Sequence, residues 1–171
     1  MASCAMGTAI DVAAWLLERA RSEDMYLQPQ KLQRLLYCAQ ACYAHEYQGR
    51  RLMPAAFVVH ELGPVEPNIF RLFEAGRPNV VIDMPPPEIE TFLERVWRRF
   101  ARNSVERLTT LVTASPAYRE IAARGDGEII PFAIVAESVA RRDAPAEKSR
   151  TPDGRTIQKW TPRRAAPREP R

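Results

Sequence analysis

The segment from Pro29 to Gly49 constrains the fold more than any other part of the sequence, because it is apolar on most sides when wound as an α-helix. Pro29 suits the first turn of a helix, and Gly49 offers a C-terminal stop. Between them, apolar residues recur at three- and four-residue spacing. A helix that is apolar on most sides is normally surrounded by other elements. We therefore predict that residues 29–49 form the central helix of the core.

Shorter helical patterns flank this segment. Thr8 with Asp11 is a candidate capping box that begins a helix ending near residues 21–24, and Asn103 with Glu106 is a second candidate. Further helices are predicted over residues 67–76, 89–100, 105–112, 116–121 and 131–139. The apolar runs 57–60 and 128–130 predict short paired strands. The predicted fold class is mainly α: a compact bundle of about six to seven helices with a small two- or three-stranded β element.

The apolar periodicity stops near Arg142, and five prolines are scattered among basic and small residues beyond it. Such a segment buries too little apolar surface to offset the entropy of ordering. We predict one domain over residues 1–141 and a disordered, basic, Pro-rich tail over residues 142–171. Ile157 and Trp160 are the apolar exceptions in this tail. They are either a docking motif that folds on binding a partner or incidental.

The positive charge of the chain is concentrated in the tail. Residues 141–171 hold ten Lys or Arg and four Asp or Glu, which leaves fifteen basic and seventeen acidic residues in 1–140. A mildly acidic body argues against nucleic acid as its partner, because phosphate binding needs a basic face on the folded part. A nucleic-acid-binding regulator of its own operon that uses the basic tail remains the alternative function.

Two further features bear on where the protein works. The sequence holds no run of about 18 apolar residues of the kind that a membrane span needs, and it has no basic segment followed by a long apolar run at its start. Three cysteines without the spacing of a disulfide scaffold suit a reducing compartment. We therefore expect a cytoplasmic protein without membrane contact.

Cysteine and histidine residues form the one pattern that resembles a metal site. Cys38, Cys42 and His45 fall on one face of the predicted central helix, and His60 could supply a fourth zinc ligand. Structural zinc sites usually pair their ligands at shorter spacing, and small cysteines are common in buried helices. We therefore expect no metal and no cofactor. A metal-dependent hydrolase built on this set is the remaining enzyme hypothesis.

Motifs for phosphate-binding loops, nucleophile elbows and zinc proteases are missing, so we expect no catalytic residues and no enzyme activity.

Two linked motifs closely resemble the signature of SocA-like, or Panacea, antitoxins. In that family, a helix reading Lys-Leu-Gln-Lys-Leu-Leu-Tyr is followed by a turn reading Gly-Pro-Val-x-Pro. The matching segments here are KLQRLLY at 31–37, followed by Ala39 and Gln40, and GPVEP at 63–67. The resemblance continues more loosely through EIIPFAIVAESV and covers roughly residues 8–140.

The resemblance implies a bacterial toxin–antitoxin pair. It implies that the chain binds and neutralises a cognate toxin protein, acting as a proteolytic adaptor that delivers the toxin to the ClpXP protease. From their chemistry, the polar signature residues favour holding the turn in place over contacting the toxin directly. Tyr37 and His60 are predicted to share a polar cluster. The candidate partner-binding or signature residues are Lys31, Gln33, Arg34, Tyr37, Gln40, His60, Gly63, Pro64, Val65 and Pro67.

Overall fold

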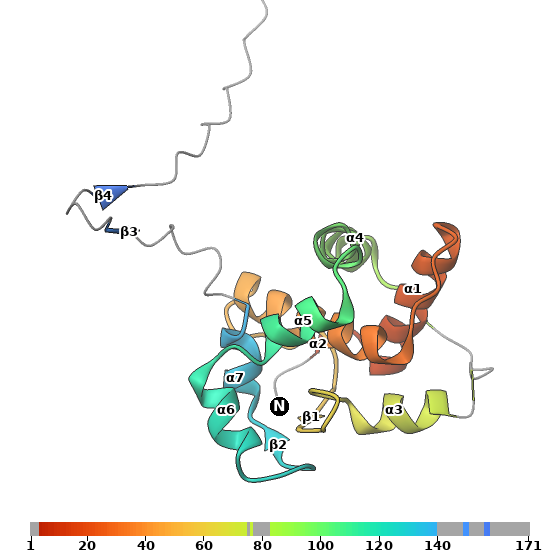
Figure 1. The fold of residues 1–171 in the computed structure, drawn as a ribbon. Coiled ribbons are helices and arrows are strands. Elements are labelled where there is room, and N and C mark those ends of the chain that lie inside the picture. Colours follow the sequence, from red (N-terminus) through yellow and green to blue (C-terminus); the bar gives the residue numbers. More distant parts are fainter. Residues whose placement is uncertain (1–3, 75, 77–82, 140–148, 151–155, 158–171) are drawn as a thin grey trace, which may run out of the picture. The chain divides into compact units, whose positions relative to one another are not determined.

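The computed structural model describes residues 4–74, 76, 83–139, 149–150 and 156–157. Contacts between residues divide the chain into two units, Met1–Arg141 and Arg142–Arg171. The mainly α architecture with a small antiparallel sheet confirms the predicted fold class (Figure 1). No helix among the described residues is long and apolar enough to cross a membrane. The elements of the first unit are α1 (Ala9–Ser22), α2 (Pro29–Glu46), β1 (Phe57–Val58), α3 (Pro67–Glu74), α4 (Pro87–Phe100), α5 (Val105–Val112), α6 (Pro116–Ala122), β2 (Ile129–Ile130) and α7 (Phe132–Glu137).

The helix α2 lies at the centre of this unit, as its apolar pattern predicts. It contacts α1, α3, α4, α5 and α7, and Figure 1 shows it running between the other helices. Twelve of its eighteen residues are buried. Three of those twelve, Gln33, Arg34 and Gln40, are polar, so the core must supply them with hydrogen-bond partners.

Local capping sets where the helices begin. The Thr8 hydroxyl accepts a hydrogen bond from the Asp11 N–H at 3.1 Å and caps α1, as predicted. The prediction for α5 was wrong by one residue, because Ser104 caps this helix and accepts from the Arg107 N–H at 3.2 Å. Asn103 instead closes the preceding turn, where its backbone N–H donates to the Phe100 carbonyl at 3.0 Å. Adjacent Asn and Ser are equally good caps, so spacing alone does not choose between them.

The predicted pairing of the two apolar runs is confirmed. β1 and β2 are antiparallel, with Phe57 opposite Ile130 and Val58 opposite Ile129. The sheet has two strands, and one isolated bridge joins Val58 to Val65. The Val58 N–H donates to the Val65 carbonyl at 2.9 Å, and the Val65 N–H donates back at 3.0 Å. The chain between these two valines is therefore folded into a tight turn.

The second unit, Arg142–Arg171, is described only at β3 (Ser149–Arg150) and β4 (Thr156–Ile157). These two strands are antiparallel, and Ile157 is paired with Ser149. Trp160 and the rest of the predicted disordered tail lie outside the described residues.

Candidate functional site

The two signature motifs meet at what we call the α2–turn junction, formed by Gln33 and Arg34 of α2 with residues 62–66. Arg34 is fully buried. Its two terminal nitrogens donate to the carbonyls of Leu62 and Pro64, and its Nε donates to the Thr109 hydroxyl at 2.9 Å. Burial lowers the pKa of Arg34 to about 10, which still leaves the guanidinium charged at neutral pH. A buried cation thus links α2, the turn and α5.

Gly63 lies directly against this guanidinium. Its φ is +100°, a backbone conformation that side chains other than glycine rarely adopt. A Cβ at this position would lie 2.7 Å from Arg34 Cζ and closer still to Nη2. The Gly63 N–H also donates to the His60 carbonyl at 2.7 Å. The turn therefore requires glycine for both its backbone angle and its contact with Arg34.

Gln33 and Glu66 complete the junction. The Gln33 side-chain oxygen accepts from the Glu66 N–H at 2.8 Å. The buried Glu66 carboxylate accepts from the Ile69 N–H at 2.7 Å and from Asn68 Nδ2 at 3.1 Å, so it caps the start of α3. Sequence reasoning missed Glu66 and Thr109. For Glu66 the signal was available, since an acidic residue directly before a helix-starting proline occupies the N-cap position.

Gln40 holds a different segment against α2. Its side-chain nitrogen donates to the Met53 carbonyl, and its side-chain oxygen accepts from the Met53 N–H, both at 3.2 Å. This pair of hydrogen bonds imitates the pairing of two strands. Gln40 therefore satisfies both backbone groups of a residue that is itself fully buried.

Replacing Gln40 by Met is expected to lower the free energy of unfolding by about 1–3 kcal/mol, because the buried Met53 N–H would lose its partner and the Met53 carbonyl would keep only the Ala55 N–H at 3.0 Å. Urea denaturation measures this loss. Gln30 lies exposed on the same helix, so Gln30→Met is the matched control and should change stability by less than about 0.5 kcal/mol. Equal losses in the two variants would contradict the role given to Gln40.

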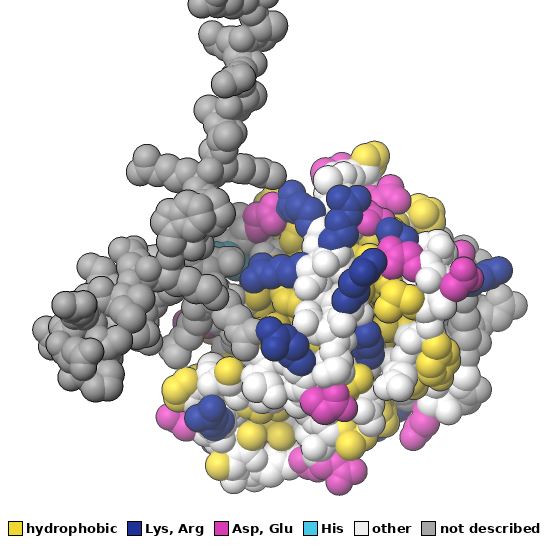
Figure 2. All heavy atoms as spheres, turned by 45° about the horizontal axis from the view of Figure 1, so that its top comes forward, with side chains coloured by type: hydrophobic (Ala, Val, Ile, Leu, Met, Phe, Trp, Pro, Cys, Tyr) yellow, Lys and Arg dark blue, Asp and Glu magenta, His cyan; other side chains and the backbone are white. Residues whose placement is uncertain are grey.

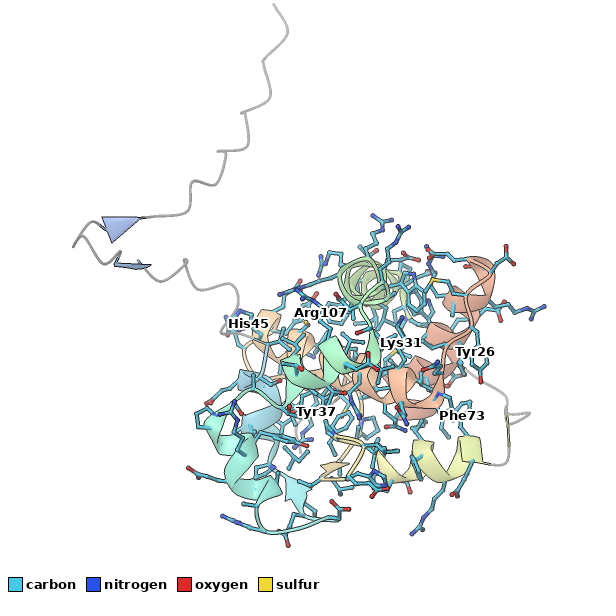
Figure 3. All side chains as sticks on the ribbon, in the orientation of Figure 1. Tyr26, Lys31, Tyr37, His45, Phe73 and Arg107 are labelled. Carbon is cyan, nitrogen blue, oxygen red and sulfur yellow. The ribbon has the colours of Figure 1, made fainter. Side chains whose placement is uncertain are left out.

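Tyr37 and His60 lie in different surroundings. The Tyr37 ring is fully buried and packs edge-on against Phe57, with ring centroids 4.9 Å apart. Its hydroxyl has no hydrogen-bond partner at normal distance within the described part of the chain. His60 is partly exposed on the turn, where its Nδ1 accepts from the Leu62 N–H at 3.1 Å and its ring faces Phe70. Figure 3 shows Tyr37 inside the bundle.

Burial raises the pKa of the Tyr37 hydroxyl and of the neighbouring Cys38 thiol well above their ordinary values of 10.0 and 9.0. Both groups stay protonated in the folded protein at a pH where the unfolded chain has lost these protons. The unfolded state therefore gains stability as pH rises. The lowered pKa of Arg34 has the opposite effect on stability. Above a pH of about 10 the folded protein loses the Arg34 proton more readily than the unfolded chain does, so this residue favours the folded state as pH rises further.

We expect the free energy of unfolding to fall by about 1.5–2 kcal/mol between pH 8 and pH 10. Urea denaturation at closely spaced pH values measures this slope. The double variant Tyr37→Phe/Cys38→Ala lacks both groups and should show a clearly smaller slope. A stability that is constant over this range, or the same slope in the variant, would contradict the expectation.

Most of the signature is not accessible to a partner. Lys31, His60 and Pro67 are partly exposed, and Figure 3 shows Lys31 near the start of α2. The other signature residues build the core and the junction, so a binding surface has to include other residues. The buried signature residues are Gln33, Arg34, Tyr37, Gln40, Gly63, Pro64 and Val65.

Two of the hollows in the described part of this unit have volumes above 300 Å³. The larger, which we call the Tyr26 cleft, has a volume of about 530 Å³ and lies between the end of α1, the start of α2 and α3. Leu17, Leu32 and Phe73 contribute to its apolar lining, and Tyr26 on its rim is 82% exposed. Figure 3 shows Phe73 reaching from α3 towards this region.

The smaller hollow, which we call the acidic groove, has a volume of about 340 Å³ and lies between α1, α4 and residues 83–85. Both hollows are of a size that can take up side chains of another molecule. The residues of the acidic groove are Asp11, Trp15, Glu18, Arg19, Ser22, Asp83, Met84, Pro85, Glu90 and Glu94.

Lys and Arg side chains gather along the middle of one face, which Figure 2 shows with Asp and Glu nearer its edges. On α4, Arg95 is 54% exposed and pairs with Glu46 at 2.5 Å. Arg98 is 77% exposed and lies 3.7 Å from Glu94. These arginines are thus partly neutralised by neighbouring carboxylates, which weakens the attraction of this face for a polyanion.

The cysteine and histidine set is dispersed. Cys38 is buried in the core, His45 is exposed near the end of α2, and His60 lies on the turn beside α3. Among the described residues, no group of three or more His, Cys, Asp or Glu side chains is arranged to hold a metal ion.

Comparison with known proteins identifies one curated relative at a significant level. No family model matches the sequence, and no solved structure matches it. The antitoxin SocA of Caulobacter vibrioides is 29% identical over 133 residues, which cover 68% of this chain and 70% of that protein. This similarity supports the resemblance to SocA-like antitoxins that the two motifs indicate.

Proposed function

We propose that this chain is an antitoxin that binds a partner toxin protein in the cytoplasm and neutralises it by binding, without catalysis of its own. The observation that carries the proposal is the similarity to the antitoxin SocA over 68% of the chain. The buried signature residues support it indirectly. They give the chain a rigid helical body on which a binding surface can be displayed.

The finer part of the proposal is that the chain acts as a proteolytic adaptor, which holds the toxin and brings it to the ClpXP protease. An adaptor needs a stable body and two separate binding surfaces. The Tyr26 cleft and the acidic groove are two separate hollows, with no lining residue in common, and so support such a role.

Co-expression with the product of the adjacent gene tests the antitoxin role. The neighbouring protein should stop growth when it is expressed alone, and this chain should restore growth. A variant with a disrupted core, Arg34→Met, serves as the inactive control. A neighbour that is harmless by itself, or toxicity that persists beside the intact chain, would contradict the proposal.

The half-life of the toxin tests the adaptor role separately. With this chain present, the toxin should be degraded faster, and only in cells that contain ClpXP. Growth rescue with an unchanged toxin half-life would contradict the adaptor role and leave neutralisation by blocking. The two experiments therefore separate binding from delivery.

A further inference from the structure

We infer that the acidic groove binds an arginine side chain of the partner protein. The inference rests on the proposed function for the identity of the partner, whereas the chemistry of the groove can be tested without it. The groove combines an apolar floor with a strongly acidic wall, and each part has a counterpart in the arginine side chain.

The floor suits the aliphatic stem and the flat face of a guanidinium. Trp15 and Pro85 are almost fully covered by the protein and form the base, while Met84 is 69% exposed at the edge. The face of a tryptophan ring attracts cations, and arginine stacks on it more often than lysine does. An exposed methionine adapts its shape to an incoming side chain.

The wall carries five carboxylates and a single arginine. That arginine, Arg19, is engaged by neighbouring side chains of the same unit. Its Nε lies 2.5 Å from Glu94, its Nη2 lies 2.8 Å from Glu23, and its Nη1 donates to the Ser22 hydroxyl at 2.8 Å. Arg19 therefore neutralises Glu94 in part, and a second carboxylate of the groove, Glu18, lies 3.7 Å from Arg21 Nη1.

Three of the carboxylates are exposed, and one of them, Glu18, is the partner of Arg21. Asp83 and Glu90 are exposed, and neither side chain has an ion-pair partner within the described part of the chain. Asp11, in contrast, is used internally, since its Oδ1 accepts from the Asp83 N–H at 2.9 Å. Asp83 and Glu90 are thus the groups that an arriving cation would meet first.

An unsatisfied acceptor adds an independent reason to expect a donor. Glu94 Oε2 is buried and accepts no hydrogen bond from the described residues, and Arg98 Nε at 3.7 Å is beyond hydrogen-bonding distance. Buried carboxylate oxygens normally have at least one donor. A guanidinium carries five N–H donors in a planar fork and can supply one here while also reaching Glu90.

A protein side chain fits this groove better than a metal ion. A divalent cation needs several oxygen ligands converging on one point, and no such group occurs among the described residues. The carboxylates of the groove are instead spread around an apolar base. That arrangement suits a long cation with an apolar stem.

A titration of the full chain with N-acetyl-arginine amide, followed by NMR at the Trp15 indole N–H, tests the groove directly. The indole signal should shift in a saturable way, and the uncharged, size-matched N-acetyl-citrulline amide should leave it unchanged. The isosteric variant Asp83→Asn/Glu90→Gln should weaken arginine binding about fivefold or more. The control variant Glu88→Gln/Glu120→Gln removes two exposed carboxylates outside the groove and should bind as the unaltered chain does.

Three results would overturn the inference: citrulline binding as tightly as arginine, unchanged binding in the groove variant, or a lysine probe binding as well as the arginine probe. The affinity of the same variants for the neighbouring toxin completes the test. The groove variant should bind the toxin about tenfold more weakly than the control variant. Unchanged toxin binding in the groove variant contradicts this inference alone, whereas no toxin binding by the unaltered chain contradicts the proposed function alone.

Discussion

Replacing Arg34 by Met is expected to lower the free energy of unfolding by about 3–5 kcal/mol, which is a large fraction of the stability of a domain of this size. Methionine fills part of the space but donates no hydrogen bond. The Pro64 carbonyl would then be left buried without its donor, at a cost of about 1–3 kcal/mol, and the Leu62 carbonyl would lose a part-buried hydrogen bond. The link to Thr109 of α5 would also be lost.

Urea denaturation of the two proteins measures this difference. The matched control is Arg102→Met, which removes an exposed arginine and should change stability by less than about 0.5 kcal/mol. A loss below about 1 kcal/mol for Arg34→Met would show that the turn does not depend on the buried guanidinium.

Gly63→Ala is the second substitution with a large expected effect, about 2–4 kcal/mol of destabilisation. The φ of +100° is strained for alanine, and the new methyl group would press on the Arg34 guanidinium. Gly49→Ala is the control, because Gly49 also has a positive φ, +84°, but has open space where the Cβ would be. The difference between the two losses isolates the contact with Arg34. Equal losses in the two variants would contradict that contact.

The two substitutions should also be coupled. Once Arg34 is replaced by a more pliable side chain, the Cβ at position 63 meets less resistance. The double variant Arg34→Met/Gly63→Ala should therefore lose about 1 kcal/mol less than the sum of the single losses. Strict additivity would mean that the signature helix and the signature turn act independently.

The spacing of apolar residues predicted those parts of the fold that depend on which face of a single helix or strand is apolar. The central position of α2 follows from its apolar surface, and the pairing of residues 57–60 with residues 128–130 follows from two short apolar runs, whereas the register that places Phe57 opposite Ile130 was not predicted. The start of α5 was missed because adjacent Asn103 and Ser104 are both good caps. Which of two neighbouring caps is used depends on how the preceding helix ends, and this is a property of the folded chain.

The candidate site was less predictable, because its contacts join distant segments. The residue types of the junction were recognised from the two motifs, but the partner of Arg34 Nε, Thr109, lies 75 positions away. The acidic groove likewise brings Asp11 together with Asp83 and Glu90. Nothing in the local pattern of these three carboxylates distinguishes them from ordinary solvated charges.

The most direct measurement is the binding of the purified full chain to the purified product of its neighbouring gene. The account predicts a saturable complex with a Kd of about 1 µM or tighter, in keeping with a stable protein–protein interface. It also predicts that Glu88→Gln/Glu120→Gln leaves this affinity unchanged. A correctly folded pair that forms no complex at concentrations of about 100 µM would contradict the central claim that this chain works by binding a toxin.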